Sequence, residues 1–124
     1  MTENKIRSFT DVNAWKEGHN LVLMVYKATE SFPQKETFAL TNQMRRCSVS
    51  ITSNIAEGFS RSTNNDKHQF YAIAQGSLTE LQNQLLIARD IEYLKKELFQ
   101  EIADQTIIVN KLLNGLKRIK NTKY

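Results

Sequence analysis

Residues 36–58 have the sequence ETFALTNQMRRCSVSITSNIAEG, and this stretch decides the fold. Its apolar and small side chains recur every three or four positions, which is the period of an α-helix with one buried face. We expect that face to carry Leu40, Met44, Cys47, Ser48, Ile51 and Ile55. Gly58 follows the last periodic residues, and glycine often ends a helix because it accepts left-handed backbone without a steric penalty. The stretch therefore predicts a helix over 36–57.

Three other stretches have the same period. A first helix is expected over 11–31, because Pro33 cannot continue it, a third over 65–91 and a fourth over 95–119. Thr63, Asn64 or Asn65 is expected to cap the third helix. The expected buried faces are Val12, Trp15, His19, Val22, Tyr26 and Thr29 in the first helix, Phe70, Ala74, Ser77, Leu81, Leu85 and Ala88 in the third, and Leu94, Leu98, Ile102, Gln105, Val109, Leu112, Leu116 and Ile119 in the fourth.

The boundary between the third and fourth helices has no strong local signal. Neither Gly nor Pro occurs from Ser77 to Asn114, so local sequence alone permits one helix from Asp66 to Ile119. Such a helix would be about 75 Å long and would leave its apolar stripe uncovered beyond the shorter helices. We therefore expect a turn near residues 92–95.

These stretches predict one all-α domain over residues 1–124, an antiparallel up-down four-helix bundle. A chain of this length buries roughly two-thirds of the surface that its unfolded form exposes. No apolar run approaches the ~20 residues that a membrane-spanning helix needs. The single Cys47 has no partner for an internal disulfide, which is typical of a reducing compartment. We expect a cytoplasmic protein that does not span a membrane.

The positive charge of the chain is concentrated near its C-terminus. The net charge is +4, with 17 basic and 13 acidic residues. From Lys111 onward the chain has five cations and no acid, so the residues before it carry 12 basic and 13 acidic side chains. A cationic tail attracts phosphate backbones or anionic lipid. Cations in a last helical turn also complement the helix dipole, so a purely structural role is the alternative.

Catalytic and metal sites lack the residues that they need. Carboxylate-bridged metals in helical bundles use Glu-x-x-His motifs, and the only two histidines, His19 and His68, belong to none. Cys47 lies on an apolar helix face, where burial would raise its pKa and make it unreactive. Gly58 and Gly76 do not form a glycine-rich phosphate loop. We therefore expect no enzyme activity, no metal and no cofactor.

The second predicted helix has an unusual polar side. Asn54 borders the expected core and needs hydrogen-bond partners there, and Glu57 lies at the unfavourable end of the helix dipole. A cation such as Arg61, or Arg46 of another subunit, could compensate Glu57 in a buried or interfacial ion pair. A second apolar strip on this helix suggests a subunit interface, and its residues are Phe38, Val49, Thr52 and Ala56. The alternative is that Asn54, Glu57 and Gly58 only hold the helices of one chain together.

These residues also carry a resemblance to a known family. The matching positions are Trp15, Tyr26, Phe32, Pro33, Glu36, Leu40, Gln43, Arg45, Arg46, Ser50, Ile51, the run from Ser53 to Gly58, Phe70, Ala74, Gly76, Ser77, Glu80, Leu81 and Tyr93. The chain resembles the four-helix-bundle proteins encoded within intervening sequences of bacterial large-subunit ribosomal RNA genes, over about residues 9–94, and the pattern SxxSNIAEG at residues 50–58 is its most specific part. The fourth helix matches only in character, and Cys47 stands where the family usually has alanine.

The resemblance implies an antiparallel bundle assembled as a homo-oligomeric ring. A pentamer is favoured, because the related accessory variability protein of diversity-generating retroelements looks like a five-fold barrel. That relative also binds nucleic acid and a reverse transcriptase, so RNA, DNA and such a protein are the partners that the resemblance implies.

Two functions follow from the sequence. In the first, an oligomer binds RNA or DNA phosphates without reading bases, through Arg45, Arg46, Arg61, Lys117, Arg118, Lys120 and Lys123. In the second, the protein is an interaction scaffold or adaptor with no nucleic-acid role, which the nearly neutral body and the second apolar strip favour.

Overall fold

The computed structural model describes residues 5–119, which are all-helical, with no strand in this range. Its four main helices are α1 (Asn13–Thr29), α2 (Leu40–Ser60), α3 (Asn64–Asp90) and α4 (Lys96–Arg118). Single turns of 3-10 helix precede α1 and α2, as η1 (Phe9–Asp11) and η2 (Gln34–Glu36). The prediction of an all-α fold with four helices is confirmed.

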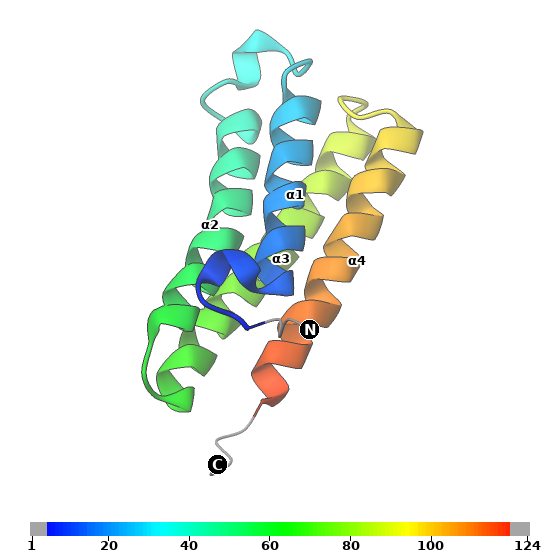
Figure 1. Cartoon of the computed structure of the whole chain (residues 1–124). Helices are drawn as coiled ribbons and strands as arrows, with labels where there is room; N and C mark the ends of the chain where they lie inside the picture. The colour runs from blue at the N-terminus through cyan, green and yellow to red at the C-terminus, as the bar shows by residue number, and fades with distance from the viewer. Residues whose placement is uncertain (1–4, 120–124) are drawn as a thin grey trace.

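The four helices enclose one core. Each helix packs against its neighbours in the chain, and α1 also packs against α4. The α1–α2 and α3–α4 connections lie at one end of the molecule and the α2–α3 connection at the other (Figure 1). Ile51, Leu81 and Val109, from three different helices, are completely buried, as the helical periods predicted. None of the helices in residues 5–119 is both long and apolar enough to cross a bilayer.

The predicted buried face of α1 is partly wrong: Val12, Val22 and Thr29 are buried as expected, but the other three predicted residues are not. Its buried side chains are Ala14, Gly18, Leu21, Val22, Val25, Ala28 and Thr29. His19 and Tyr26 are exposed, and Trp15 is only partly buried. A Cβ atom on Gly18 would lie 3.1 Å from Thr52 Cγ2 of α2, so close approach between the two helices requires small residues on this face. Packing of the backbones, rather than the size of the apolar side chains, therefore selects the inner face of α1.

Helix α2 begins four residues later than predicted, because η2 precedes it. The Glu36 side chain caps the first turn of α2 and also contacts Tyr93. Its Oε1 accepts a hydrogen bond from the Leu40 backbone N–H at 3.2 Å, which satisfies one of the unpaired N–H groups of the first turn. Its Oε2 accepts from the Tyr93 hydroxyl at 2.9 Å, which ties this connection to the one between α3 and α4.

The turn predicted near 92–95 is present, since α3 ends at Asp90 and α4 begins at Lys96. Glu92 has φ 67° and is the one non-glycine residue with positive φ in residues 5–119. The Tyr93 N–H donates to the Ala88 carbonyl at 2.8 Å, and the Glu92 N–H donates to the Arg89 carbonyl at 3.0 Å. These two bonds form a Schellman motif, in which a left-handed residue ends the helix. The chain makes this turn without glycine.

Candidate nucleic-acid interface

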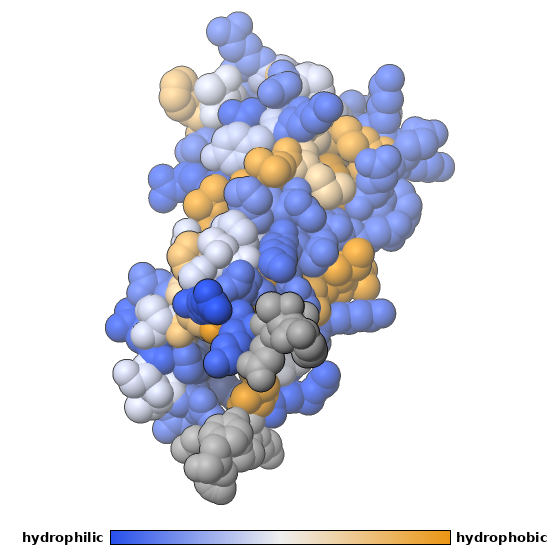
Figure 2. All heavy atoms as spheres, viewed as in Figure 1, coloured by the Kyte–Doolittle hydropathy of each residue, from blue (hydrophilic) through white to orange (hydrophobic). Residues whose placement is uncertain are grey.

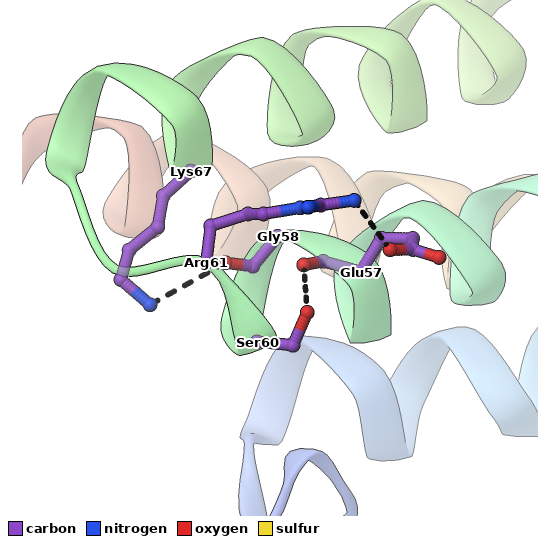
Figure 3. A network of polar contacts seen from close by, with 5 residues as sticks. All are labelled: Glu57, Gly58, Ser60, Arg61 and Lys67. Atoms are coloured by element: carbon purple, nitrogen blue, oxygen red, sulfur yellow. Dashed lines mark hydrogen bonds and ion pairs between the residues drawn. The ribbon is translucent and has the colours of Figure 1, made fainter.

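Two cationic side chains that follow α2 in the sequence, Arg61 and Lys67, contact the C-terminal end of this helix. The Arg61 guanidinium lies 2.8 Å from Glu57 Oε2 and 4.6 Å from the centre of the Phe70 ring. Lys67 Nζ donates to the Phe59 carbonyl at 2.8 Å, so a cation satisfies one of the last carbonyls of α2. It also donates to the Gly58 carbonyl at 3.4 Å (Figure 3). Both cations therefore stabilise the negative end of the α2 dipole while lying near the surface.

The Glu57 ion pair forms within one chain. Its partner is Arg61, and the two side chains are 51% and 44% exposed, so the pair is not buried in the single chain. An exposed pair of this kind contributes about 0–1 kcal/mol. Glu57 and Arg61 thus position each other at the surface and leave the outward side of the guanidinium accessible.

Gly58 does not have the predicted role at the end of the helix. The helix continues to Ser60, and no glycine in residues 5–119 has positive φ. The residue is instead fixed by the approach of α3, because a Cβ atom at Gly58 would lie 2.6 Å from Tyr71 Cε1 and 3.1 Å from Phe70 Cβ. Gly58 is therefore a packing residue, and the expectation of a left-handed glycine at C′ is wrong.

Asn54 has the hydrogen-bond partners that its position required. Its Nδ2 donates to the Ser50 carbonyl at 2.8 Å and to Ser50 Oγ at 3.2 Å. Ser50 Oγ is also 2.8 Å from Ser77 Oγ of α3. Ser50 and Asn54 of the SxxSNIAEG stretch thus form a small network with Ser77 between α2 and α3.

Cys47 lies next to this network. Burial first, and then the Glu80 carboxylate, raise the pKa of the Cys47 thiol to about 12. The thiol donates to the Ser77 carbonyl at 2.9 Å. It therefore remains protonated near neutral pH and holds α2 against α3.

Arg45 and Arg46 are adjacent in the sequence but have different surroundings in the structure. Arg45 Nε donates to Thr29 Oγ1 at 2.8 Å, and its guanidinium lies 4.7 Å from the centre of the Tyr26 ring, so this side chain fastens α2 to the end of α1. Arg46 is exposed and has no hydrogen bond or ion pair to another side chain in the described part of the chain. It borders an α2–α3 groove of about 270 Å³ that Ser77 and Glu80 also line.

The C-terminal cations begin in a polar seam between α3 and α4. Lys117 Nζ donates to Gln75 Oε1 at 2.6 Å, and Gln75 Nε2 donates to Asn114 Oδ1 at 2.8 Å. Arg118 is exposed at the last residue of α4. Lys120 and Lys123 lie outside the described residues.

Charged side chains are distributed unequally between the two ends of the molecule. We define the basic end as residues 5–17, 54–72 and 108–119, which include the α2–α3 connection. It has a net charge of +4, from eight cations and four acids: Lys5, Arg7, Lys16, Arg61, Lys67, Lys111, Lys117 and Arg118 against Asp11, Glu17, Glu57 and Asp66. The other described residues carry seven cations and eight acids, a net charge of −1. The whole positive excess of residues 5–119 therefore lies at one end.

Three of the five predicted cations within residues 5–119 belong to this end, and several other cations there were missed. Arg61, Lys117 and Arg118 lie at the basic end, whereas Arg45 and Arg46 lie outside it. Lys67 was missed, although its place in the first turn of α3, the wrong end of that helix dipole for a cation, indicated a local acceptor. The surface seen in Figure 2 is largely hydrophilic, with apolar side chains in separate groups. No group of three or more metal-ligating side chains occurs in residues 5–119.

The fold and this charge distribution define a small all-helical protein with one cationic end. Residues 10–115 match the family model of the 23S rRNA-intervening sequence protein, and the chain belongs to this family. The resemblance seen in the sequence is therefore confirmed.

A solved structure shares the fold. It is a crystal structure from Bacteroides thetaiotaomicron VPI-5482, described as a protein with unknown function from the S23 ribosomal protein family. The two chains are 21% identical with a TM-score of 0.76, and the match covers 86% of this chain and 99% of the other. No curated protein matches the chain.

Proposed function

We propose that this protein is a non-enzymatic, antiparallel up-down bundle that assembles into a homo-oligomeric ring and binds the phosphate backbone of RNA or DNA without reading bases. The observation that carries the proposal is the net charge of +4 at the basic end against −1 for the other described residues. Phosphate contacts supply most of sequence-independent affinity, and they need accessible cations grouped on one surface.

The basic end has the cations in suitable places. Lys111 and Arg118 are exposed on α4, and Arg61 is exposed after α2. Their positions at one end matter because a nucleic acid can contact only one face of a small domain at a time. Lys120 and Lys123 continue the same cationic sequence. Arg46 is a secondary contact in this proposal, and Arg45 acts by holding α1 and α2 together.

Assembly strengthens this interaction. A ring whose copies present their basic ends on one side multiplies the number of phosphate contacts without any new contact type. A pentamer and a reverse transcriptase partner remain the assembly and the protein partner that the family resemblance implies. A cytoplasmic location is proposed as well, supported by the unpaired, buried Cys47.

Salt dependence tests the proposal. A labelled RNA or DNA strand is titrated with the protein between about 50 and 200 mM salt, and the log of the affinity is expected to fall steeply and linearly with the log of salt concentration. Undetectable binding at the lowest salt would refute the nucleic-acid role. Light scattering tests the ring separately, since it should give a mass several times 14.3 kDa, and a monomer would contradict it.

A protein-interaction scaffold is the second candidate, and exposed apolar side chains favour it. Phe38 is 92% exposed, and a groove of about 290 Å³ between α3 and α4 is lined by Leu86, Phe99, Ala103 and Ile107 among others. A pull-down from nuclease-treated lysate separates the two functions. A partner bridged by nucleic acid is lost after this treatment, whereas a direct protein partner is retained.

A further inference from the structure

Three aromatic rings form a contiguous cluster at the start of α1. The Trp15 and His19 rings lie 4.8 Å apart at an interplanar angle of 16°, so they are stacked face to face. The Phe9 ring contacts Trp15 edge-on, with centroids 5.3 Å apart. Trp15 and His19 are four residues apart, which places their side chains on the same side of the helix. We call Phe9, Trp15 and His19 the aromatic platform.

The backbone around the platform is fixed by local hydrogen bonds. The Asp11 carboxylate accepts from the Arg7 N–H at 2.9 Å and from the Ser8 N–H at 3.3 Å, and the Ser8 hydroxyl accepts from the Thr10 N–H at 3.1 Å. These bonds form a capping box over η1, the turn that carries Phe9. The platform is therefore preorganised before any ligand arrives.

The outer surface of the platform faces solvent. Trp15 packs against the hydrophobic core and is partly buried, whereas His19 is exposed and Phe9 is 36% exposed. Trp15 thus anchors the platform to the core. One face of the His19 ring stacks on Trp15, and no other ring of residues 5–119 contacts His19. An exposed, fixed aromatic face is the feature on which nucleic-acid bases stack.

Two exposed cations lie near the platform in the sequence. Phe9 and Trp15 belong to the basic end, and His19 lies two residues beyond its first segment. The exposed side chains of Arg7 and Lys16 are close to Phe9 and Trp15 in the sequence. Lys16 is three residues before His19, so both lie on neighbouring parts of the helix surface. Of the two acids nearby, Asp11 is occupied by the η1 backbone and Glu17 accepts from Gln105 Nε2 at 2.8 Å. A phosphate backbone beside the platform would therefore be attracted by Arg7 and Lys16. The two carboxylates there already accept hydrogen bonds from the protein.

We propose that the aromatic platform stacks an unpaired base, so that the preferred nucleic acid is single-stranded. This inference rests on the proposed nucleic-acid function and names its substrate class. Only an unpaired base presents its flat face, because the bases of a duplex are stacked on one another and expose the phosphate backbone instead. Sequence tolerance follows, since every base has a face that can stack.

Trp15 provides the readout, because it is the only tryptophan in the chain. A labelled single strand and a duplex of equal length are titrated with the full chain at about 50 mM salt, a concentration at which phosphate contacts are strong. Anisotropy of the label reports binding, and Trp15 fluorescence reports stacking. The single strand is expected to quench Trp15 saturably at the midpoint of the anisotropy change, whereas the duplex binds with little quenching.

Two variants and a control sharpen the test. His19→Ala and Phe9→Ala should each weaken single-strand binding about fivefold or more, the range found for loss of one stacking contact, and should leave duplex binding unchanged. Phe38→Ala is the matched control, because Phe38 is an exposed aromatic residue outside the basic end. Single-strand binding without Trp15 quenching, at wild-type affinity in both variants, would overturn the platform and leave the proposed function intact. No anisotropy change with either nucleic acid would overturn both.

Discussion

The α2–α3 and α3–α4 connections, at opposite ends of the bundle, both end one helix and start the next, but they do so in opposite ways. Each must end one helix and start another within a few residues, since Arg61–Thr63 separate α2 from α3 and Ile91–Lys95 separate α3 from α4. The first connection follows a glycine, Gly58, that stays helical. The second has no glycine and places Glu92 in the left-handed conformation. Glycine is therefore present at a position with ordinary helical φ and absent at the position with positive φ.

This comparison shows that close packing, as well as backbone conformation, determines where glycine occurs. At Gly58 the Tyr71 ring occupies the space that a Cβ atom would need. At Glu92 the Schellman hydrogen bonds and the packing of α4 against α3 hold the strained residue in place. Electrostatics also separate the two ends, because the positive excess surrounds the α2–α3 connection.

The largest stability change is expected at Gly58. Gly58→Ala should lower the free energy of unfolding by about 1–3 kcal/mol, because the new Cβ atom must displace the Tyr71 ring. Gly76→Ala is the matched control in α3, where a Cβ atom meets nothing within 4 Å, and it should raise stability by about 0.5–1 kcal/mol. Urea denaturation measures both. An unchanged midpoint for Gly58→Ala would contradict the packing explanation.

At the α3–α4 connection we expect a substitution by glycine to increase stability. Glu92→Gly should stabilise the protein by about 1 kcal/mol, because glycine adopts positive φ without the strain that a side chain causes. Glu101→Gly, an exposed position within α4, should instead destabilise it by about 1 kcal/mol. Thermal unfolding followed by circular dichroism distinguishes the two. If both variants lose stability equally, Glu92 is not strained.

A smaller effect distinguishes two arginines with similar surroundings. Arg61 pairs with Glu57 and lies over Phe70, and Arg89 pairs with Asp90 and lies over Phe99 at 4.8 Å. Replacing either with Ala should cost about 1 kcal/mol or less, since both ion pairs are exposed. Only Arg61→Ala should reduce the salt slope of nucleic-acid affinity, by about one. The same reduction in Arg89→Ala would show that binding is not localised at the basic end.

The smallest effect is a local response to pH at the basic end. Hydrogen bonds from the Arg7 N–H first, and then the Ser8 N–H, hold the pKa of Asp11 below its ordinary value of 3.8. The ionised cap thus contributes stability above that value and loses it as the pH falls through the lower, folded-state pKa. Acidification below 3.8 should loosen η1 and change Trp15 fluorescence. Asp11→Asn should lack this part of the transition, and an identical profile in the variant would exclude the cap as its cause.

Helical periodicity predicted the elements because it reports burial along each chain segment. The α2 face from Met44 to Ile55 is buried as expected, because its apolar residues occur at regular spacings separated by polar ones. The face of α1 was wrong in part, at Trp15, His19 and Tyr26, because five apolar residues, Leu21–Val25, follow one another and fit several helix rotations. Gly18 and Ala14 decide the rotation through contact with α2, and such contacts depend on tertiary structure.

The candidate nucleic-acid interface was predictable only in part, because folding brings some of its residues together from distant segments of the chain. The tail cations Lys117 and Arg118 are visible as a charge run in the sequence. Lys67 and Arg7 join them through folding, since they belong to segments far apart in the chain. Arg45 seemed equivalent to Arg46, but only the structure shows that its donors are occupied by α1. The aromatic platform also depends on η1, whose capping box places Phe9 against Trp15.

The most direct test compares two pairs of charge reversals. Lys111→Glu with Arg118→Glu changes two exposed cations at the basic end, and Lys95→Glu with Lys96→Glu changes two exposed cations outside it. Affinity for a labelled strand at about 100 mM salt should fall tenfold or more for the first pair and stay within about twofold for the second. Equal losses in both pairs would show that binding follows net charge alone and would contradict a nucleic-acid interface at the basic end.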